Sequence, residues 1–80
     1  MSMIESIAKF TIDNGGMFYE LEDDDGLRLC MIKTRFSDGR NFFYNNPTYQ
    51  IFDKEGRRIF VSSIIDEAYK KYDNLRSGGG

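Results

Sequence analysis

The side chains that most often carry out catalysis are nearly absent from this 80-residue chain. There is no histidine, so the usual general base near neutral pH is missing, together with any Ser-His or Cys-His pair. The lone cysteine, Cys30, lies among Leu29, Met31 and Ile32, which favours a buried, unreactive thiol. No glycine-rich phosphate loop interrupts the chain. We therefore expect a protein that is not an enzyme and that needs no cofactor.

Carboxylates gather in one run in the first half of the chain. They surround a turn marked by Gly26. Hard cations prefer carboxylate oxygens, but an EF-hand loop alternates its ligands and ends with a glutamate, which this run does not. We expect no metal site, and we interpret the run as either a solvated turn or an acidic hairpin that binds a partner. Its members are Glu20, Glu22, Asp23, Asp24 and Asp25.

A second stretch combines aromatic rings, amides and basic side chains. Two consecutive rings, Phe42 and Phe43, must point to opposite faces of a strand. Exposed rings can stack on nucleobases while guanidinium groups contact phosphates, and Tyr and Arg are also frequent anchors of protein interfaces. The alternative is that all these rings belong to the core. The candidate ligand-binding residues are Arg35, Arg40, Phe43, Tyr44, Tyr49 and Arg58.

Charge is unevenly distributed, although the net charge is only −2. Residues 1–26 carry seven acidic side chains against one lysine, a balance of −6. Residues 27–61 carry seven basic side chains against three acidic ones, a balance of +4. Such a split within a small protein can orient a partner or a second copy of the chain, or it can simply cover a solvated sheet face.

These residues must be positioned by short strands, because turn signals rich in Asp, Asn and Gly recur at short intervals. Between the turns, apolar and aromatic residues predict six strands, and a change of face near Met31-Ile32 predicts a bend there. The fold class is α+β, mostly β: a six-stranded antiparallel meander that forms a curled sheet or a small barrel. The expected strands are 8–12, 17–22, 27–36, 40–44, 48–52 and 57–61.

The hydrophobic period changes to that of a helix near the C-terminus. Ser63 and Asp66 fit a capping box, and an apolar stripe follows, so we expect an amphipathic helix over 64–76 that packs on the sheet. Residues 77–80 are rich in Gly and predict a flexible tail. At the other end, residues 2–7 are compatible with a short helical turn. Residues 1–76 are expected to form one small β-rich domain.

An internal repeat relates residues 19–31 to residues 49–61 without a gap. Tyr, Asp, Gly and Arg recur at identical positions, and apolar residues recur in kind. Two explanations remain open. One is a pair of three-stranded halves related by a pseudo-twofold axis, which would make Arg28 and Arg58 equivalent. The other is convergence, since many hairpin turns favour Asp followed by Gly.

Composition limits the location and the partner. No apolar run approaches the roughly 20 residues that a membrane span needs, the N-terminus does not resemble a signal peptide, and a single cysteine fits a reducing compartment. We expect a cytoplasmic protein that makes no membrane contact. The first hypothesis for its function is a protein-binding module, such as a small inhibitor of the kind encoded by phages and mobile elements. Nucleotide or nucleic-acid binding is the alternative, and a homo-oligomer is a third hypothesis.

Overall fold

The fold consists of a four-stranded antiparallel sheet, a separate two-stranded hairpin and two helices. The computed structural model describes residues 1–78. Within this range the strand order of the main sheet is β1-β2-β5-β6, and β3 pairs with β4. The elements in chain order are α1 (Met3–Asp13), β1 (Met17–Asp24), β2 (Leu27–Lys33), β3 (Arg35–Ser37), β4 (Phe42–Tyr44), β5 (Thr48–Phe52), β6 (Arg58–Ser62) and α2 (Ile65–Arg76).

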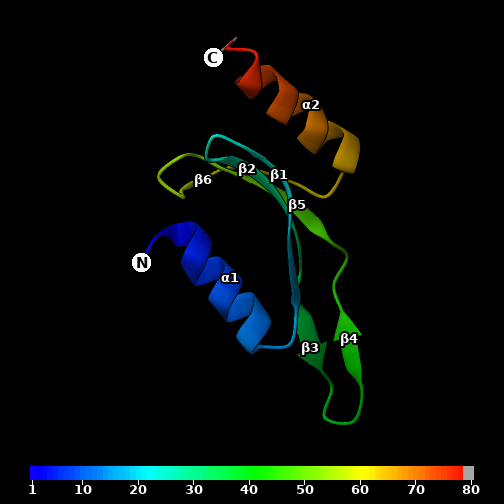
Figure 1. Cartoon of the computed structure of the whole chain (residues 1–80). Helices are drawn as coiled ribbons and strands as arrows, with labels where there is room; N and C mark the ends of the chain where they lie inside the picture. Colours follow the sequence, from blue (N-terminus) through cyan, green and yellow to red (C-terminus); the bar gives the residue numbers. More distant parts are fainter. Residues whose placement is uncertain (79–80) are drawn as a thin grey trace.

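Two helices cover opposite faces of the sheet, α1 on one side and α2 on the other (Figure 1). Each interface has its own core. Beneath α1, Ile4 packs with Cys30, Ile32 and Phe52. Beneath α2, the buried residues are Leu29, Ile51, Ala68 and Tyr72. Alternate residues of the central strands therefore enter two different cores, which makes both faces of β2 and β5 apolar.

The hairpin β3–β4 continues the central strands beyond the sheet. Strand β2 is followed by Thr34 and then by β3, while β4 leads through residues 45–47 into β5. Both outer strands of the main sheet stop short of this hairpin: β1 begins at Met17, opposite Lys33, and β6 ends at Ser62, opposite Tyr49. The hairpin consequently projects from the body of the molecule, whose dimensions are 48 × 28 × 15 Å (Figure 1). We call residues 33–45 the arm.

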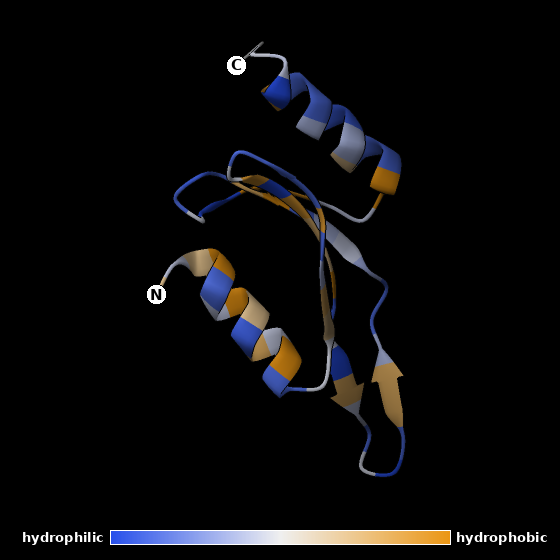
Figure 2. Ribbon diagram, in the orientation of Figure 1, coloured by the Kyte–Doolittle hydropathy of each residue, from blue (hydrophilic) through white to orange (hydrophobic). Residues whose placement is uncertain are grey.

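The prediction of a strand at 8–12 is wrong, because these residues belong to α1. Ser2 and Glu5 form a capping box: the Ser2 hydroxyl accepts a bond from the Glu5 amide and donates one to the Glu5 carboxylate. Ile4 and Thr11 are buried on the side that meets the sheet. Alternating hydropathy along α1 is visible in Figure 2. The short helical turn expected at 2–7 is the beginning of this longer helix.

The prediction of an α+β, mostly β fold with antiparallel strands is confirmed, but the six strands form two sheets and not a single sheet or a barrel. The main sheet has four strands and remains open, with β1 and β6 at its edges. No bulge interrupts the pairing at Met31-Ile32, since both residues pair regularly with β1 and β5. The change of apolar face there reflects the two cores on either side of the sheet. Irregular pairing lies instead between Glu20 and Glu22 in β1, and the long strand is interrupted at Thr34.

The C-terminal helix is present, but its start differs from the prediction. Its N-cap is Ile64, which makes no side-chain capping bond, so the proposed box of Ser63 and Asp66 is not formed. Ser62 takes that role: its hydroxyl accepts a bond from the Ile64 amide and donates one to Glu67. Gly79 and Gly80, the last residues of the tail predicted at 77–80, lie outside the described residues.

The sequence repeat corresponds to similar turns and not to two three-stranded halves. Gly26 and Gly56 both adopt positive φ, at 95° and 81°. However, the first hairpin closes with the two-residue turn Asp25-Gly26, whereas the second has a longer loop. The register then differs, so Leu29 is fully buried while its repeat counterpart Ile59 is exposed. The pseudo-twofold arrangement is not observed.

Candidate functional site: a projecting aromatic arm

The arm exposes aromatic side chains on both of its faces. Phe36 and Phe43 are paired across the hairpin and stack, with ring centroids 5.4 Å apart. Phe42 and Tyr44 share the opposite face, because side chains alternate along a strand. The exposed fractions are 49% for Phe36, 65% for Phe42, 42% for Phe43 and 46% for Tyr44. The explanation that all these rings are core residues is therefore wrong.

Two cations lie over rings on the second face of the arm. The guanidinium carbon of Arg35 is 4.4 Å from the centroid of Phe42, and Nζ of Lys33 is 5.8 Å from that of Tyr44. Such contacts stabilise an exposed pair by about 0.5–1 kcal/mol. They also hold the long basic side chains flat against the arm. This face therefore presents positive charge and aromatic surface together.

Several polar contacts fix the base and the tip of the arm. At the base, Nε of Arg35 donates to the Asn14 carbonyl (3.2 Å), which ties the arm to the end of α1. Asn45 holds the two strands together, since its amide nitrogen and side chain both donate to Thr34. At the tip, the Asp38 carboxylate accepts bonds from the amides of Arg40 and Asn41, which lowers the pKa of Asp38. The rings are thus displayed by an ordered hairpin.

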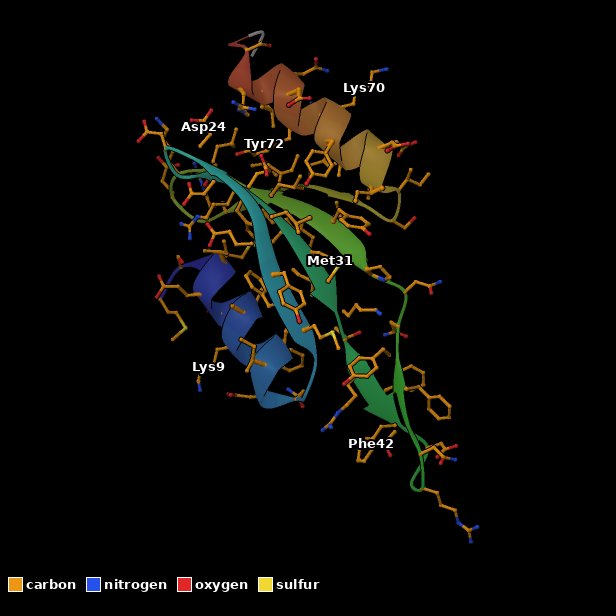
Figure 3. The ribbon with its side chains drawn as sticks, turned by 45° about the vertical axis from the view of Figure 1, so that its right-hand side comes forward. Lys9, Asp24, Met31, Phe42, Lys70 and Tyr72 are labelled. Carbon is orange, nitrogen blue, oxygen red and sulfur yellow. The ribbon has the colours of Figure 1, made fainter. Side chains whose placement is uncertain are left out.

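The acidic hairpin predicted from the sequence lies at the other end of the sheet, around the β1–β2 turn. Asp24 forms an ion pair with Arg76 (2.8 Å), and Asp25 forms one with Lys54 (3.6 Å). Asp23 accepts a bond from the Gly26 amide and so closes the turn. Figure 3 shows Asp24 at this turn, below the C-terminal end of α2. Two of the five predicted carboxylates are consequently paired with cations of the same chain.

The structure gathers only part of the predicted ligand-binding set. Arg35, Arg40, Phe43 and Tyr44 belong to the arm. Tyr49 is partly buried against the core beneath α2. Arg58 lies on β6, where its guanidinium donates to the Gln50 side chain.

Sequence reasoning missed three members of the arm surface: Lys33, Phe36 and Phe42. The signal that could have found the two rings is the alternation of residues in two strands joined by Ser37-Asp38-Gly39, which predicts an aromatic hairpin. Lys33 enters the site only because the arm continues directly from β2.

Other kinds of site find little support in the described residues. Burial raises the pKa of the Cys30 thiol to about 12, so the thiolate needed for nucleophilic attack is scarce at neutral pH. Within residues 1–78 no group of three or more His, Cys, Asp or Glu side chains is arranged to hold a metal ion. Neither described helix is long and apolar enough to cross a bilayer. A hollow of about 260 Å³ is lined by Asp24, Asp25, Leu27, Lys54, Leu75 and Arg76.

Comparison with protein-family models, with curated proteins and with solved structures finds no match to this chain.

Proposed function

We propose that this protein is a non-enzymatic binding module that docks on another protein through its arm. The observation that carries the proposal is the display of four large rings on an ordered hairpin that contributes none of the buried core residues. Aromatic side chains and arginine are the residues that dominate binding energy at protein interfaces. An exposed apolar cluster of this kind is a typical mark of an interaction surface.

The proposal implies that the protein acts by occupying a surface of its partner. A module without catalytic groups changes its partner by covering a surface of it, as a small inhibitor of the phage-encoded kind does. The arm is well suited to enter a groove, since it is narrow, has two different faces and projects beyond the sheet (Figure 1). The acidic hairpin is proposed as a secondary contact, through the carboxylates that have no ion pair in the described chain: Glu20, Glu22 and Asp23.

Affinity capture from a host lysate, followed by mass spectrometry, tests the proposal. The bait is the full chain, with Phe42→Ser and Phe43→Ser as variants that each remove one face of the arm. Ile59→Ser is the matched control, because Ile59 is similarly exposed but lies on β6. We expect the same partner to be retained by the wild type and the control and lost with both arm variants. Capture that is equal for all four baits would contradict the proposal.

Nucleic-acid binding remains a second candidate, supported by the arm's basic side chains. Lys33 and Arg35 lie over rings, and the acidic β1–β2 turn lies at the far end of β2, so its carboxylates do not face a ligand held by the arm. A two-stranded ribbon can enter a major groove, and rings can stack on unpaired bases. Affinity for an oligonucleotide should then fall steeply with salt. An affinity that is nearly flat in salt, or no binding at all, rejects this candidate.

A further inference from the structure

Two of the places where ionised side chains of the described chain lack an ion pair lie along the central strands and have opposite net charge, although the arm also contains the unpaired Asp38 and Arg28 lies opposite Asp23. In the arm, Lys33, Arg35 and Arg40 form no ion pair within residues 1–78. On the edge strand β1 and the turn after it, Glu20, Glu22 and Asp23 form none in that range either. We call the outer side of residues 19–23 the acidic edge. The arm and the acidic edge thus have opposite charge.

Within one molecule these groups are kept apart by the strands themselves. The arm continues β2 away from the β1–β2 turn, and Glu20 pairs with Cys30, three residues before Lys33, so the nearest carboxylate of the acidic edge lies roughly 10 Å along the strand from the arm. This exceeds the screening length of about 8 Å at physiological salt. The arm is therefore poorly placed to neutralise the acidic edge of its own chain. Arg28 lies opposite Asp23, but Glu20 and Glu22 form no ion pair in the described chain and are available to a cation of another molecule.

From this complementarity we infer that the arm of one copy docks on the acidic edge of a second copy. The contact is reciprocal: two antiparallel copies each place their arm against the β1 edge of the other, which gives a closed twofold dimer. The alternatives are unfavourable, since arm against arm would bring cations together and β1 against β1 would bring carboxylates together. The inference rests on the proposal that the arm is a docking surface, and it names a partner for it.

The acidic edge, which receives the arm in this dimer, also offers an unpaired strand edge and an aromatic ring. β1 is an edge strand of eight residues, so its outer backbone groups are free to accept an added strand. Tyr19, which is 53% exposed, adds an aromatic ring to the same strand, on the opposite face from Glu20. The arm offers rings together with cations of opposite charge to this edge. Main-chain pairing, ring contact and ion pairs can therefore form together at one interface.

The rings supply part of the area that a specific dimer needs. Each face of the arm carries two rings that are about half exposed, which offer roughly 200 Å² per face, given about 200 Å² for a fully buried aromatic side chain. Two arms and two receiving surfaces of matching size bury about 800 Å² from the rings alone, and main-chain pairing and ion pairs add to this. A foreign protein that binds the arm must displace the second copy. Dimerisation and partner binding are consequently expected to compete.

Charge exchange between two variants gives a specific test by sedimentation equilibrium. One variant carries Lys33→Glu and Arg40→Glu in the arm, and the other carries Glu20→Lys and Glu22→Lys at the acidic edge. We expect a wild-type dimer that weakens with salt, and two variants that are each monomeric. When the variants are mixed, each arm meets an edge of opposite charge in both contacts, so the dimer should return. Lys70→Glu with Lys71→Glu on α2 is the matched control and should leave the dimer unchanged.

Several results would overturn the inference. These are a wild type that stays monomeric up to about millimolar concentration, variants that remain dimeric, or monomeric variants that do not associate when mixed. A complex that disappears after nuclease treatment also contradicts it and favours nucleic acid as the partner. Far-ultraviolet circular dichroism checks that each variant keeps its fold. If dimerisation is absent but Phe42→Ser and Phe43→Ser still abolish capture of a host protein, the proposed function stands and only this inference fails.

Discussion

The two ends of the central strands use charge in opposite ways. At the turn end, two carboxylates are matched by cations from distant parts of the chain, Asp24 by Arg76 and Asp25 by Lys54, and Asp53 is matched by Arg57 within its own turn. At the arm end, cations lie over aromatic rings and no described carboxylate pairs with them. Charge at the turn end is thus largely paired within the chain. Positive charge at the arm end has no carboxylate partner among residues 1–78, and there we propose that another molecule binds.

Aromatic residues show the same contrast. Tyr72 of α2 is almost fully buried beside Leu29 and Ile51, and its hydroxyl donates to the Leu27 carbonyl at 2.6 Å. It points from α2 toward the sheet in Figure 3, whereas Phe42 extends from the arm. Rings near the turn end are therefore part of the core. Rings in the arm can be changed with little effect on the remainder of the fold.

Removing one ring from each region should give the largest difference in stability. We expect Tyr72→Ala to lower the free energy of unfolding by about 3–5 kcal/mol, through lost burial and the cavity that remains. Phe43→Ala should lower it by no more than about 1 kcal/mol, because it removes only a half-exposed cross-strand ring pair. Tyr72→Phe isolates the hydroxyl and should cost about 1–2 kcal/mol. Urea unfolding followed by circular dichroism measures all three, and similar losses for Tyr72→Ala and Phe43→Ala would refute the contrast.

Two glycines with positive φ give a second matched comparison. Gly56 in the β5–β6 turn and Gly39 at the arm tip have φ of 81° and 100°. A methyl group at Gly56 would lie 2.8 Å from Cβ of Ser2 and 3.0 Å from Cγ2 of Ile4, whereas at Gly39 it would meet nothing within 4 Å. Both Gly→Ala changes should cost about 1–2 kcal/mol for the backbone, and Gly56→Ala about 1–3 kcal/mol more for crowding. Equal melting temperatures for the two variants would argue against close packing of α1 on this turn.

Acid should destabilise the two ends of the central strands differently, and by less than the substitutions above. Backbone hydrogen bonds lower the pKa of Asp53 in the β5–β6 turn and of Asp38 at the arm tip. Because a lowered folded-state pKa stabilises the structure only where the carboxylate is charged, the contribution is complete above the unfolded value near 4 and is lost as pH falls through the folded value. Loss of the charge on Asp53 should lower the stability of the whole fold, whereas loss of the charge on Asp38 should loosen only the arm tip. NMR titration of both carboxyl groups, with melting curves of Asp53→Asn and Asp38→Asn, measures this. A larger drop in melting temperature for Asp38→Asn than for Asp53→Asn would contradict this difference between the two ends.

Much of the main sheet could be predicted from the sequence because its signals are local. The Asp-Gly turn at Asp25-Gly26 matches the positive φ of both residues, and the apolar stripe of 64–76 predicts α2 to within a residue. The error at 8–12 has a physical cause. Over five residues, Ala8, Phe10 and Ile12 fit an alternating strand, and only a longer window with Ile4 and Thr11 reveals the helical period.

The sequence predicts which residue types form the candidate site, but it does not predict that their side chains are exposed. Phe42-Phe43-Tyr44 looks like a core strand by itself, since hydrophobicity does not tell whether a neighbouring strand or helix covers it. Exposure arises because β1 begins at Met17 and β6 ends at Ser62, which leaves the arm without neighbours. The same reasoning explains why Tyr49 and Arg58 do not belong to the candidate site. They follow the arm in sequence but lie within the sheet, where Tyr49 packs against the core beneath α2 and Arg58 bonds to Gln50.

Chemical-shift mapping on the full-length chain tests most directly whether the arm is the docking surface. Amide spectra recorded over a dilution series, or with a captured partner added, report which residues change environment. Changes concentrated in residues 33–45, accompanied on dilution by changes at residues 19–23, are the expected result. Changes confined to β6 or to the outer side of α1, with the amides of Phe36, Phe42 and Phe43 unaffected, would contradict it.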